Sequence, residues 1–159
     1  MSATFYNAAL VLHIVGITMM AGTSFIDYIT FRFFYKTYAT DTAKGLVLES
    51  YLYNLQRFLG IGMLLILASG ITMMVKLHNV WGAQLWFRIK MGLLLLVIIN
   101  GLGLRRMLGL RLRKTLSNGT AAIVMGEKWN TIKRNFTMVQ FIQILLFITI
   151  FILSVFKFN

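Results

Sequence analysis

Four long apolar stretches alternate with polar, basic segments along the chain. They cover residues about 5–33, 58–77, 85–104 and 136–156, and each can cross a bilayer as a helix, which takes roughly 20 residues. The runs are unbroken and lack the alternation of β-strands, so a transmembrane barrel is excluded. The pattern predicts an all-α fold, a four-helix transmembrane bundle with long antiparallel helices in one integral membrane domain over 1–159.

The first stretch carries small and polar residues on one helical face, at steps of three and four. They are His13, Gly16, Met20, Thr23 and Asp27. An imidazole and a carboxylate are costly against lipid, so this face should look into the protein interior. Either the face packs, with Gly16 admitting another helix and His13 bonded to a neighbour's hydroxyl, or it holds a cofactor with His13 as axial ligand.

Three helices should extend beyond the bilayer on the basic side of the protein. The first stretch runs on to about Tyr38, and Thr40 or Asp41 is the expected N-cap of one helix over about 41–77. The turn signal Ser-Asn-Gly-Thr at 117–120 predicts that the last helix begins near Thr120.

Composition fits a membrane protein and narrows its chemistry. With 58% hydrophobic residues and four acids, the chain is too apolar for a soluble domain of this length. It has no Cys, which removes disulfides, iron–sulfur clusters and thiolate catalysis. Two histidines and four acids cannot build a typical hydrolytic metal centre, and no HExxH, P-loop or GxGxxG motif is present in the sequence.

The net charge of +12 predicts the orientation. The first and third connections with their flanking helix ends hold 12 basic residues: Arg32, Lys36, Lys44, Arg57, Arg105, Arg106, Arg111, Arg113, Lys114, Lys128, Lys133 and Arg134. The opposite side holds 4: Lys76, Arg88, Lys90 and Lys157. The positive-inside rule then puts both termini outside. Because the basic residues flank apolar stretches, we expect contacts with lipid headgroups and no nucleic-acid partner.

Two candidate site residues fall at similar depth in the outer half of the bundle. His13 and Lys90 lie roughly 12 and roughly 8 Å below the starts of their helices, at 1.5 Å per residue. Lys90 shares its helical face with Val97, Asn100 and Gly101, which favours a position facing the bundle. Alternatively, its long side chain reaches the headgroups.

Asp27 and the polar residues of the last stretch have packing interpretations. Asp27 lies near the inner side and should form a buried ion pair, with Arg57 as the first choice of partner. The last stretch carries a stripe that should form interhelical hydrogen bonds. Its members are Gln140, Gln143, Phe147 and Ser154.

The second connection carries aromatic and imidazole side chains. Trp81 and Trp86 suit the membrane interface, where the indole N–H stays wet. We expect His78 to lie in solvent or among headgroups, with a ligand role as the alternative. Met20 and Met73 should mostly fill gaps between helices, with ligation of iron or copper as their alternative.

Three short motifs along the chain have counterparts in a known family. LHIVGITMMAG at 12–22 has a His followed by small residues that end in Ala-Gly. WFRIKM at 86–91 has a Lys four residues after a Trp, and KRNFTMVQ at 133–140 contains Arg-Asn. Together they resemble the first-helix, third-helix and last-helix motifs of the HemJ-type protoporphyrinogen oxidases, and the spacing extends the likeness over most of the chain.

The resemblance implies a haem b protein of the bacterial inner membrane. It implies His13 as haem ligand, Lys90 as the second functional residue, and oxidation of protoporphyrinogen IX to protoporphyrin IX with electrons passed to quinone. Gly16, one turn after His13, would let a flat macrocycle approach the backbone, and Met20 is a further candidate contact.

The chain also departs from the family's pattern. It has Met19 and Met20 where an aromatic usually precedes Ala-Gly, and Arg88 where a His is common. These differences favour a relative of the family over a member with identical activity. The alternative function is a small non-catalytic membrane protein without haem, using the same face for helix packing, a partner or copper. The bilayer is the expected partner in both cases, and a homo-oligomer stays open.

Overall fold

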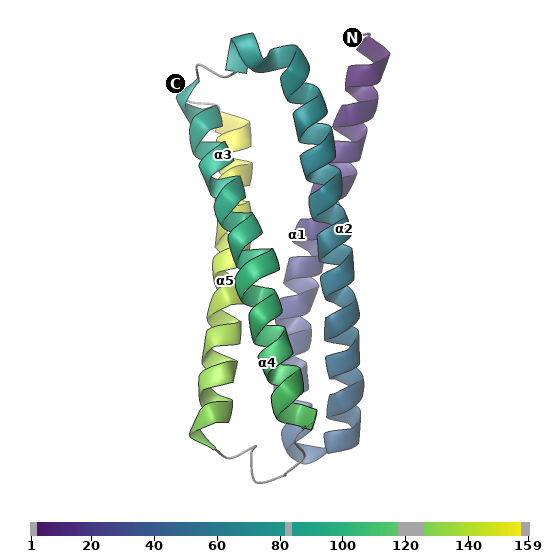
Figure 1. Ribbon diagram of the computed structural model, residues 1–159, viewed down its shortest axis with the longest axis vertical. Coiled ribbons are helices and arrows are strands. Elements are labelled where there is room, and N and C mark those ends of the chain that lie inside the picture. Colours follow the sequence, from purple (N-terminus) through teal and green to yellow (C-terminus); the bar gives the residue numbers. More distant parts are fainter. Residues whose placement is uncertain (1–2, 82–83, 118–125, 157–159) are drawn as a thin grey trace.

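Four long helical rods run up and down the molecule (Figure 1). The computed structural model describes residues 3–81, 84–117 and 126–156, without the side chains of 76–81 and 128. The helices are α1 (Ala3–Thr40), α2 (Thr42–Trp81), α3 (Leu85–Ile98), the π-helical segment η1 (Ile99–Leu104), α4 (Arg105–Ser117) and α5 (Glu127–Phe156). Because α3, η1 and α4 follow one another without a break, they form a single rod, the third of the four.

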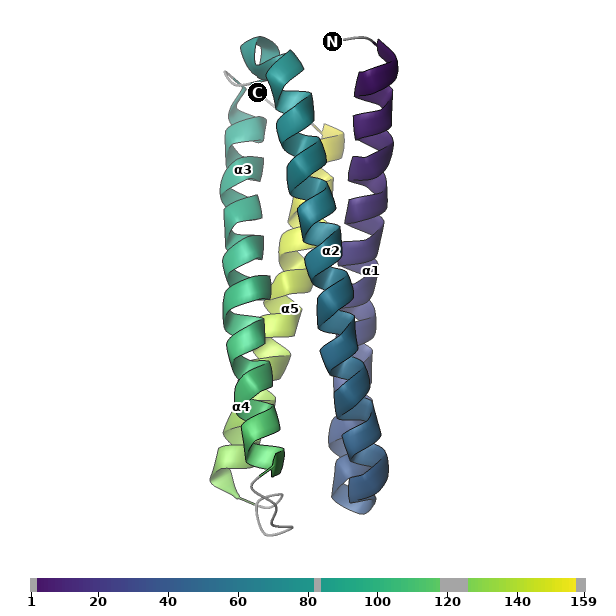
Figure 2. The ribbon, with the colours of Figure 1, turned by 45° about the vertical axis from the view of Figure 1, so that its right-hand side comes forward.

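Contacts between neighbouring rods close them into a bundle. α1 packs along α2, α5 packs on both α1 and α3, and α4 contacts α2. Figure 2 shows α5 behind α2, between α1 and the rod of α3 and α4. α1 begins and α5 ends at the same end of the bundle, where α2 also passes into α3 (Figure 1). The predicted all-α bundle of four long helices is confirmed.

The first connection is a single residue, Asp41, between two helices of 38 and 40 residues. The backbone N–H of Lys44 donates to Asp41 Oδ1 at 3.1 Å, and the Lys44 ammonium lies 3.0 Å from Oδ2. The backbone hydrogen bond, followed by the side-chain contact, holds the pKa of Asp41 below its usual value. Asp41 therefore caps α2, as the sequence predicts.

The other two connections differ in part from the predictions. Gly126 forms a bend and α5 begins at Glu127; the expected helix start near 120 lies outside the described residues. Trp86 is only 5% exposed, and its indole N–H donates to Gln84 Oε1 instead of facing headgroups. The side chains of His78 and Trp81 lie outside the described residues.

The helix pair α1–α2 is held close by two glycines that face each other. A Cβ on Gly62 would lie 3.0 Å from Gly16 O and 3.0 Å from Met20 N, and one on Gly16 would lie 3.0 Å from Gly62 O. Since these neighbours are backbone atoms, only a residue without a side chain fits at either position. The predicted packing role of Gly16 is confirmed.

Two apolar clusters fill the interior, one in each half of the bundle. The outer cluster joins all four rods around the fully buried Met20 and Val97. The inner cluster is rich in aromatic rings: Phe31 stacks on Phe136 with centroids 4.1 Å apart, and Trp129 is 2% exposed. The aromatic cluster lies in the half that bears most of the basic residues, and it packs all four rods there.

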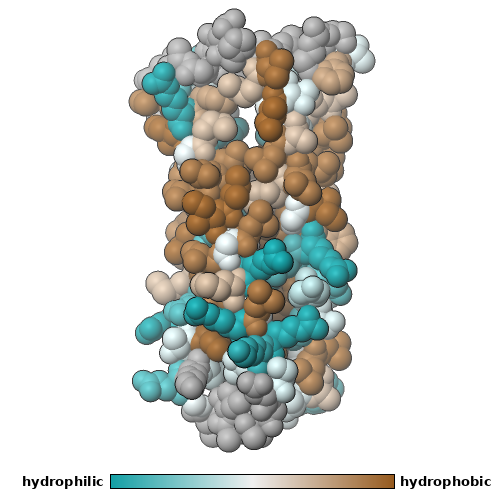
Figure 3. Space-filling model, in the orientation of Figure 1, coloured by the Kyte–Doolittle hydropathy of each residue, from teal (hydrophilic) through white to brown (hydrophobic). Residues whose placement is uncertain are grey.

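The outer surface is apolar over a broad band and basic below it (Figure 3). Side chains on the band point away from the protein, such as Leu64 at 68% and Ile71 at 66% exposed. All four rods are long and apolar enough to cross a membrane. At 1.5 Å per residue the 38 residues of α1 span about 57 Å, against a hydrocarbon core of about 30 Å. The chain is a membrane protein whose helices extend beyond the bilayer.

The glycine contact yields a stability prediction. Gly62→Leu would force a side chain between α1 and α2, and we expect it to lower the free energy of unfolding by about 1–3 kcal/mol. Gly60→Leu is the matched control on the same helix, because no atom lies within 4 Å of a Cβ placed there. The check is an unfolding titration of both variants in detergent. Equal effects at the two positions would contradict close packing at Gly62.

Candidate functional site

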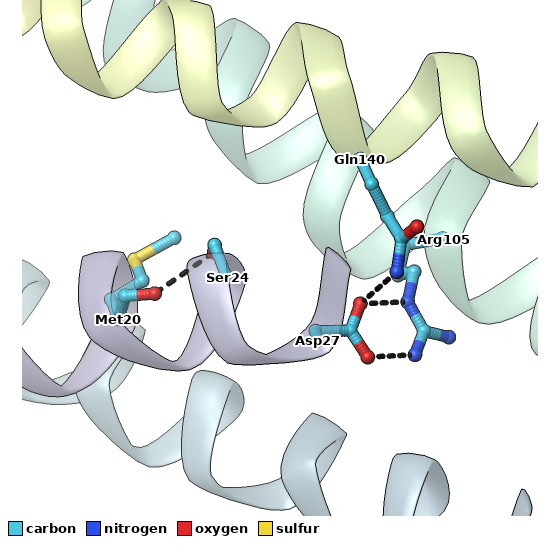
Figure 4. Close-up of polar contacts among 5 residues, drawn as sticks. All are labelled: Met20, Ser24, Asp27, Arg105 and Gln140. Atoms are coloured by element: carbon cyan, nitrogen blue, oxygen red, sulfur yellow. Dashed lines mark hydrogen bonds and ion pairs between the residues drawn. The ribbon is translucent and has the colours of Figure 1, made fainter. Parts of the chain in front are cut away.

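A buried cluster of charged and polar side chains joins α1, α4 and α5 (Figure 4). Arg105 donates from Nε to Asp27 Oδ2 at 2.9 Å and from Nη2 to Oδ1 at 2.6 Å. Gln140 Nε2 donates to the same Oδ2 at 2.6 Å. All three residues are at most 5% exposed. The parallel two-point geometry is the strongest form of an arginine–carboxylate contact, and it satisfies both oxygens of Asp27.

The predicted buried ion pair of Asp27 is confirmed, but the predicted partner Arg57 is wrong. Arg57 lies on the exposed face of α2, with its guanidinium 5.5 Å from the ring centre of Tyr53. Arg105 instead enters the interior, where its guanidinium also lies 4.3 Å from the ring centre of Phe136. Asp27 therefore pairs with Arg105, the arginine of the third rod whose side chain points into the bundle.

Arg105 follows directly after the π-helical segment η1. Arg105 N–H bonds to Asn100 O, five residues back, where an α-helix would reach back four. This wider turn shifts the face that the rod presents after it. Arg105 then aligns with the buried Leu108 and Leu112 at steps of three and four. That spacing in the sequence indicates that Arg105 is on the buried face. The prediction missed it because Arg105 belongs to a basic run that is typical of a cytoplasmic loop.

Amide side chains continue the polar cluster toward the middle of the bundle. Asn100 Nδ2 donates to Val139 O at 2.9 Å and to Gln143 Oε1 at 2.7 Å, which confirms the expected interhelical bonds of that stripe. Among the described residues, Gln140 Oε1 and Gln143 Nε2 are buried side-chain atoms without a hydrogen-bond partner. Both glutamines line a cavity of about 10 Å³, the size that holds one water molecule.

His13 lies on the same face of α1, about four helical turns from Asp27. Its side chain is half-buried, and Nδ1 lies 2.9 Å from Ser69 Oγ on α2. A Cβ on Gly70 would lie 3.5 Å from His13 Cε1, so the glycine leaves room for the ring. This is the bond to a neighbour's hydroxyl that the packing interpretation predicts.

The partners of Ser69 determine which nitrogen of His13 carries the proton. The Ser69 hydroxyl donates its one hydrogen to a backbone carbonyl of its own helix, that of Leu65 or of Ile66. When the hydroxyl donates to one of these carbonyls it accepts from His13, and Nδ1 is then the nitrogen that carries the hydrogen. In the neutral imidazole Nε2 then keeps its lone pair. A histidine whose other nitrogen donates in this way is typical of a metal ligand, and the arrangement fits an axial role.

Lys90 lies on α3, near the end of the bundle where α1 also begins, in the same half as His13 (Figure 1). Its side chain is half-buried, and Val97, Asn100 and Gly101 on the same face are buried. Figure 3 shows the surface hollowed at this end, between α3 and α2. The structure thus places His13 and Lys90 on different rods in the same half of the bundle.

Gly16 and Met20, the other two candidate contacts, lie deeper. The space beside Gly16 is filled by Gly62 and Ile66 of α2, and Met20 is 0% exposed in the outer apolar cluster. Ser24 Oγ donates to Met20 O at 2.9 Å (Figure 4). Both residues serve packing in this structure.

No group of three or more His, Cys, Asp or Glu side chains gathers in the described part of the chain, so a multi-carboxylate metal centre does not arise there. Comparison with protein-family models, with curated proteins and with solved structures finds no match.

Removal of Arg105 should be far more damaging than removal of Arg57. Arg105→Ala leaves the Asp27 carboxylate buried without its counter-charge, and we expect a loss of about 3–5 kcal/mol in the free energy of unfolding. Asp27→Asn should cost less, since Asn still accepts a hydrogen bond and Arg105 borders a wide cavity that admits water. Arg57→Ala should change stability by less than about 0.5 kcal/mol.

Thermal and denaturant unfolding in detergent check this order. A loss for Arg57→Ala as large as that for Arg105→Ala would contradict the pairing seen in the structure.

Proposed function

We propose that the chain is a membrane redox protein that binds haem b through His13. The observation that carries the proposal is the hydrogen bond between His13 Nδ1 and Ser69 Oγ, because with Nδ1 as the donor the lone pair of Nε2 is available to a metal. Haem iron accepts an axial histidine, and when bound the group supplies one-electron chemistry. Ser69 and Gly70 fix the direction of the ring, the first by its hydrogen bond and the second by leaving space.

Lys90 is the second residue of the proposed site. As a cation it holds an acidic group, either a propionate of the cofactor or a carboxylate of the substrate. As a neutral amine it is instead a second ligand, a role that burial makes accessible. We restrict the proposed site to His13 and Lys90, because Gly16 and Met20 already pack against α2 and the outer cluster.

The proposed substrate is a porphyrinogen, with oxidation of protoporphyrinogen IX to protoporphyrin IX and transfer of the electrons to quinone. This part rests on the resemblance of the motifs around His13 and Lys90 to those of HemJ-type oxidases. The proposed location is the bacterial inner membrane with both termini outside, supported by the distribution of basic residues, 12 against 4 as counted above.

A second candidate is a non-catalytic membrane protein without haem. The observation that favours it is that helix packing accounts for most of the polar face of α1: Gly16 meets Gly62, His13 meets Ser69 and Asp27 meets Arg105. Haem binding separates the two candidates, because a packing role predicts a colourless protein.

Absorbance of the detergent-purified protein tests the haem proposal. Protein made with adequate haem supply should show a Soret band, which His13→Ala should lose. Ser69→Ala removes only the acceptor for Nδ1 and should weaken haem affinity about 10–100-fold. Thr72→Ala is the matched control, because its hydroxyl bonds Ala68 O on its own helix. A colourless wild-type protein, or a band unaffected by His13→Ala, would refute the proposal.

The proposed orientation can be tested by single cysteines, because the chain has none of its own. Asn7 and Ala43 are exposed and lie near the opposite ends of α1. A membrane-impermeant maleimide should label Asn7→Cys in intact cells with a permeable outer envelope, and Ala43→Cys only after the inner membrane is opened. The reverse labelling pattern would invert the topology.

A further inference from the structure

An arginine-lined cleft opens between α2 and α4 in the basic half of the bundle. Its volume is about 280 Å³, at the lower end of the range for small-ligand sites. Four arginines line it: Arg57 from α2, and Arg105, Arg106 and Arg113 from α4. Figure 3 shows hydrophilic side chains gathered over this part of the surface.

The charge of the cleft is not balanced by the protein. Arg105 is neutralised by Asp27, which leaves three guanidinium groups against the single carboxylate of Glu49. Arg57 and Arg113 approach the same aromatic ring from different helices, at 5.5 and 5.0 Å from the centre of Tyr53. Cations held together in this way repel one another unless an anion lies between them.

Arg105 forms part of the floor of the cleft. Its bonds to Asp27 use Nε and Nη2, and its third nitrogen, Nη1, lies beside Gly109 at the wall. A Cβ on Gly109 would come within 3.1 Å of that nitrogen, so the glycine keeps the floor open. The cleft is therefore built on a buried, fixed arginine and rimmed by exposed ones.

The depth of the cleft matches the membrane surface. Arg106 lies 21 residues after the start of α3 at Leu85, which is about 32 Å along the rod and close to one hydrocarbon thickness. Apolar side chains stand on the same walls, with Leu102 41% and Leu110 57% exposed. A ligand in the cleft would thus meet the guanidinium groups and, one turn closer to the bilayer than Arg106, the exposed side chain of Leu102.

We propose that this cleft binds the phosphate group of an anionic phospholipid, with the acyl chains lying against Leu102 on the membrane side. Guanidinium groups pair with phosphate oxygens in two-point contacts, and basic pockets between membrane helices at the inner surface are suited to such headgroups. The site is separate from His13 and Lys90 and does not rest on the haem proposal.

Native mass spectrometry of the detergent-purified protein tests the proposal. Phosphatidylglycerol should bind more tightly than phosphatidylcholine, and the double variant Arg57→Gln/Arg113→Gln should lose about tenfold or more of that affinity. The matched control is Arg32→Gln/Arg111→Gln, because both arginines are exposed, neither lines the cleft, and the net charge changes equally. Equal losses in both double variants, or none in the first, would overturn the proposal.

A single variant gives an independent readout with the opposite sign. Glu49→Gln removes the one carboxylate from the lining and should strengthen phosphatidylglycerol binding, whereas unchanged or weaker binding would count against the cleft. Inorganic phosphate alone distinguishes the source of the anion. If it binds with the same dependence on Arg57 and Arg113 while the lipid does not, the ligand is free phosphate and the lipid assignment is overturned.

Discussion

A carboxylate can remain charged among apolar helices only if every oxygen has a partner, and Asp27 meets this constraint with groups from two other helices. Arg105 supplies the counter-charge and two hydrogen bonds, and Gln140 supplies a third. These partners fix the rotation of α4 and α5 relative to α1. The inner, aromatic cluster lies on one side of this contact, and the amides of Asn100 and Gln143 lie on the other.

The sequence was sufficient for the features that depend on length and periodicity. Helix count, the hairpin cap at Asp41 and the buried face of α1 follow from apolar runs and from steps of three and four. The partner of Asp27 did not follow, because Arg105 belongs to a basic run that resembles a cytoplasmic connection, although it lies four residues after the buried Gly101. The prediction that the indole N–H of Trp86 stays in water also differs from the structure. This N–H donates to the side chain of Gln84 instead.

The polar groups divide the bundle into two chemical regions. His13 and Lys90 lie in the half that bears the chain termini, where the His13 imidazole is hydrogen-bonded to the hydroxyl of Ser69. The arginines lie in the inner half, around the fixed guanidinium of Arg105. Between the two regions lie the apolar outer cluster and the amides of Asn100 and Gln143. A ligand in either half would therefore act without direct contact with a ligand in the other.

The single-residue connection between α1 and α2 has a consequence for how the protein is made. Closing so short a loop costs little chain entropy, and the glycine contact between the two helices involves no later part of the chain. The hairpin can therefore associate as soon as both helices have entered the bilayer during synthesis. Until the third and fourth rods are inserted, Asp27 lacks the partners Arg105 and Gln140 that it has in the folded bundle, so biogenesis of this protein passes through a stage in which this acid is without its native contacts.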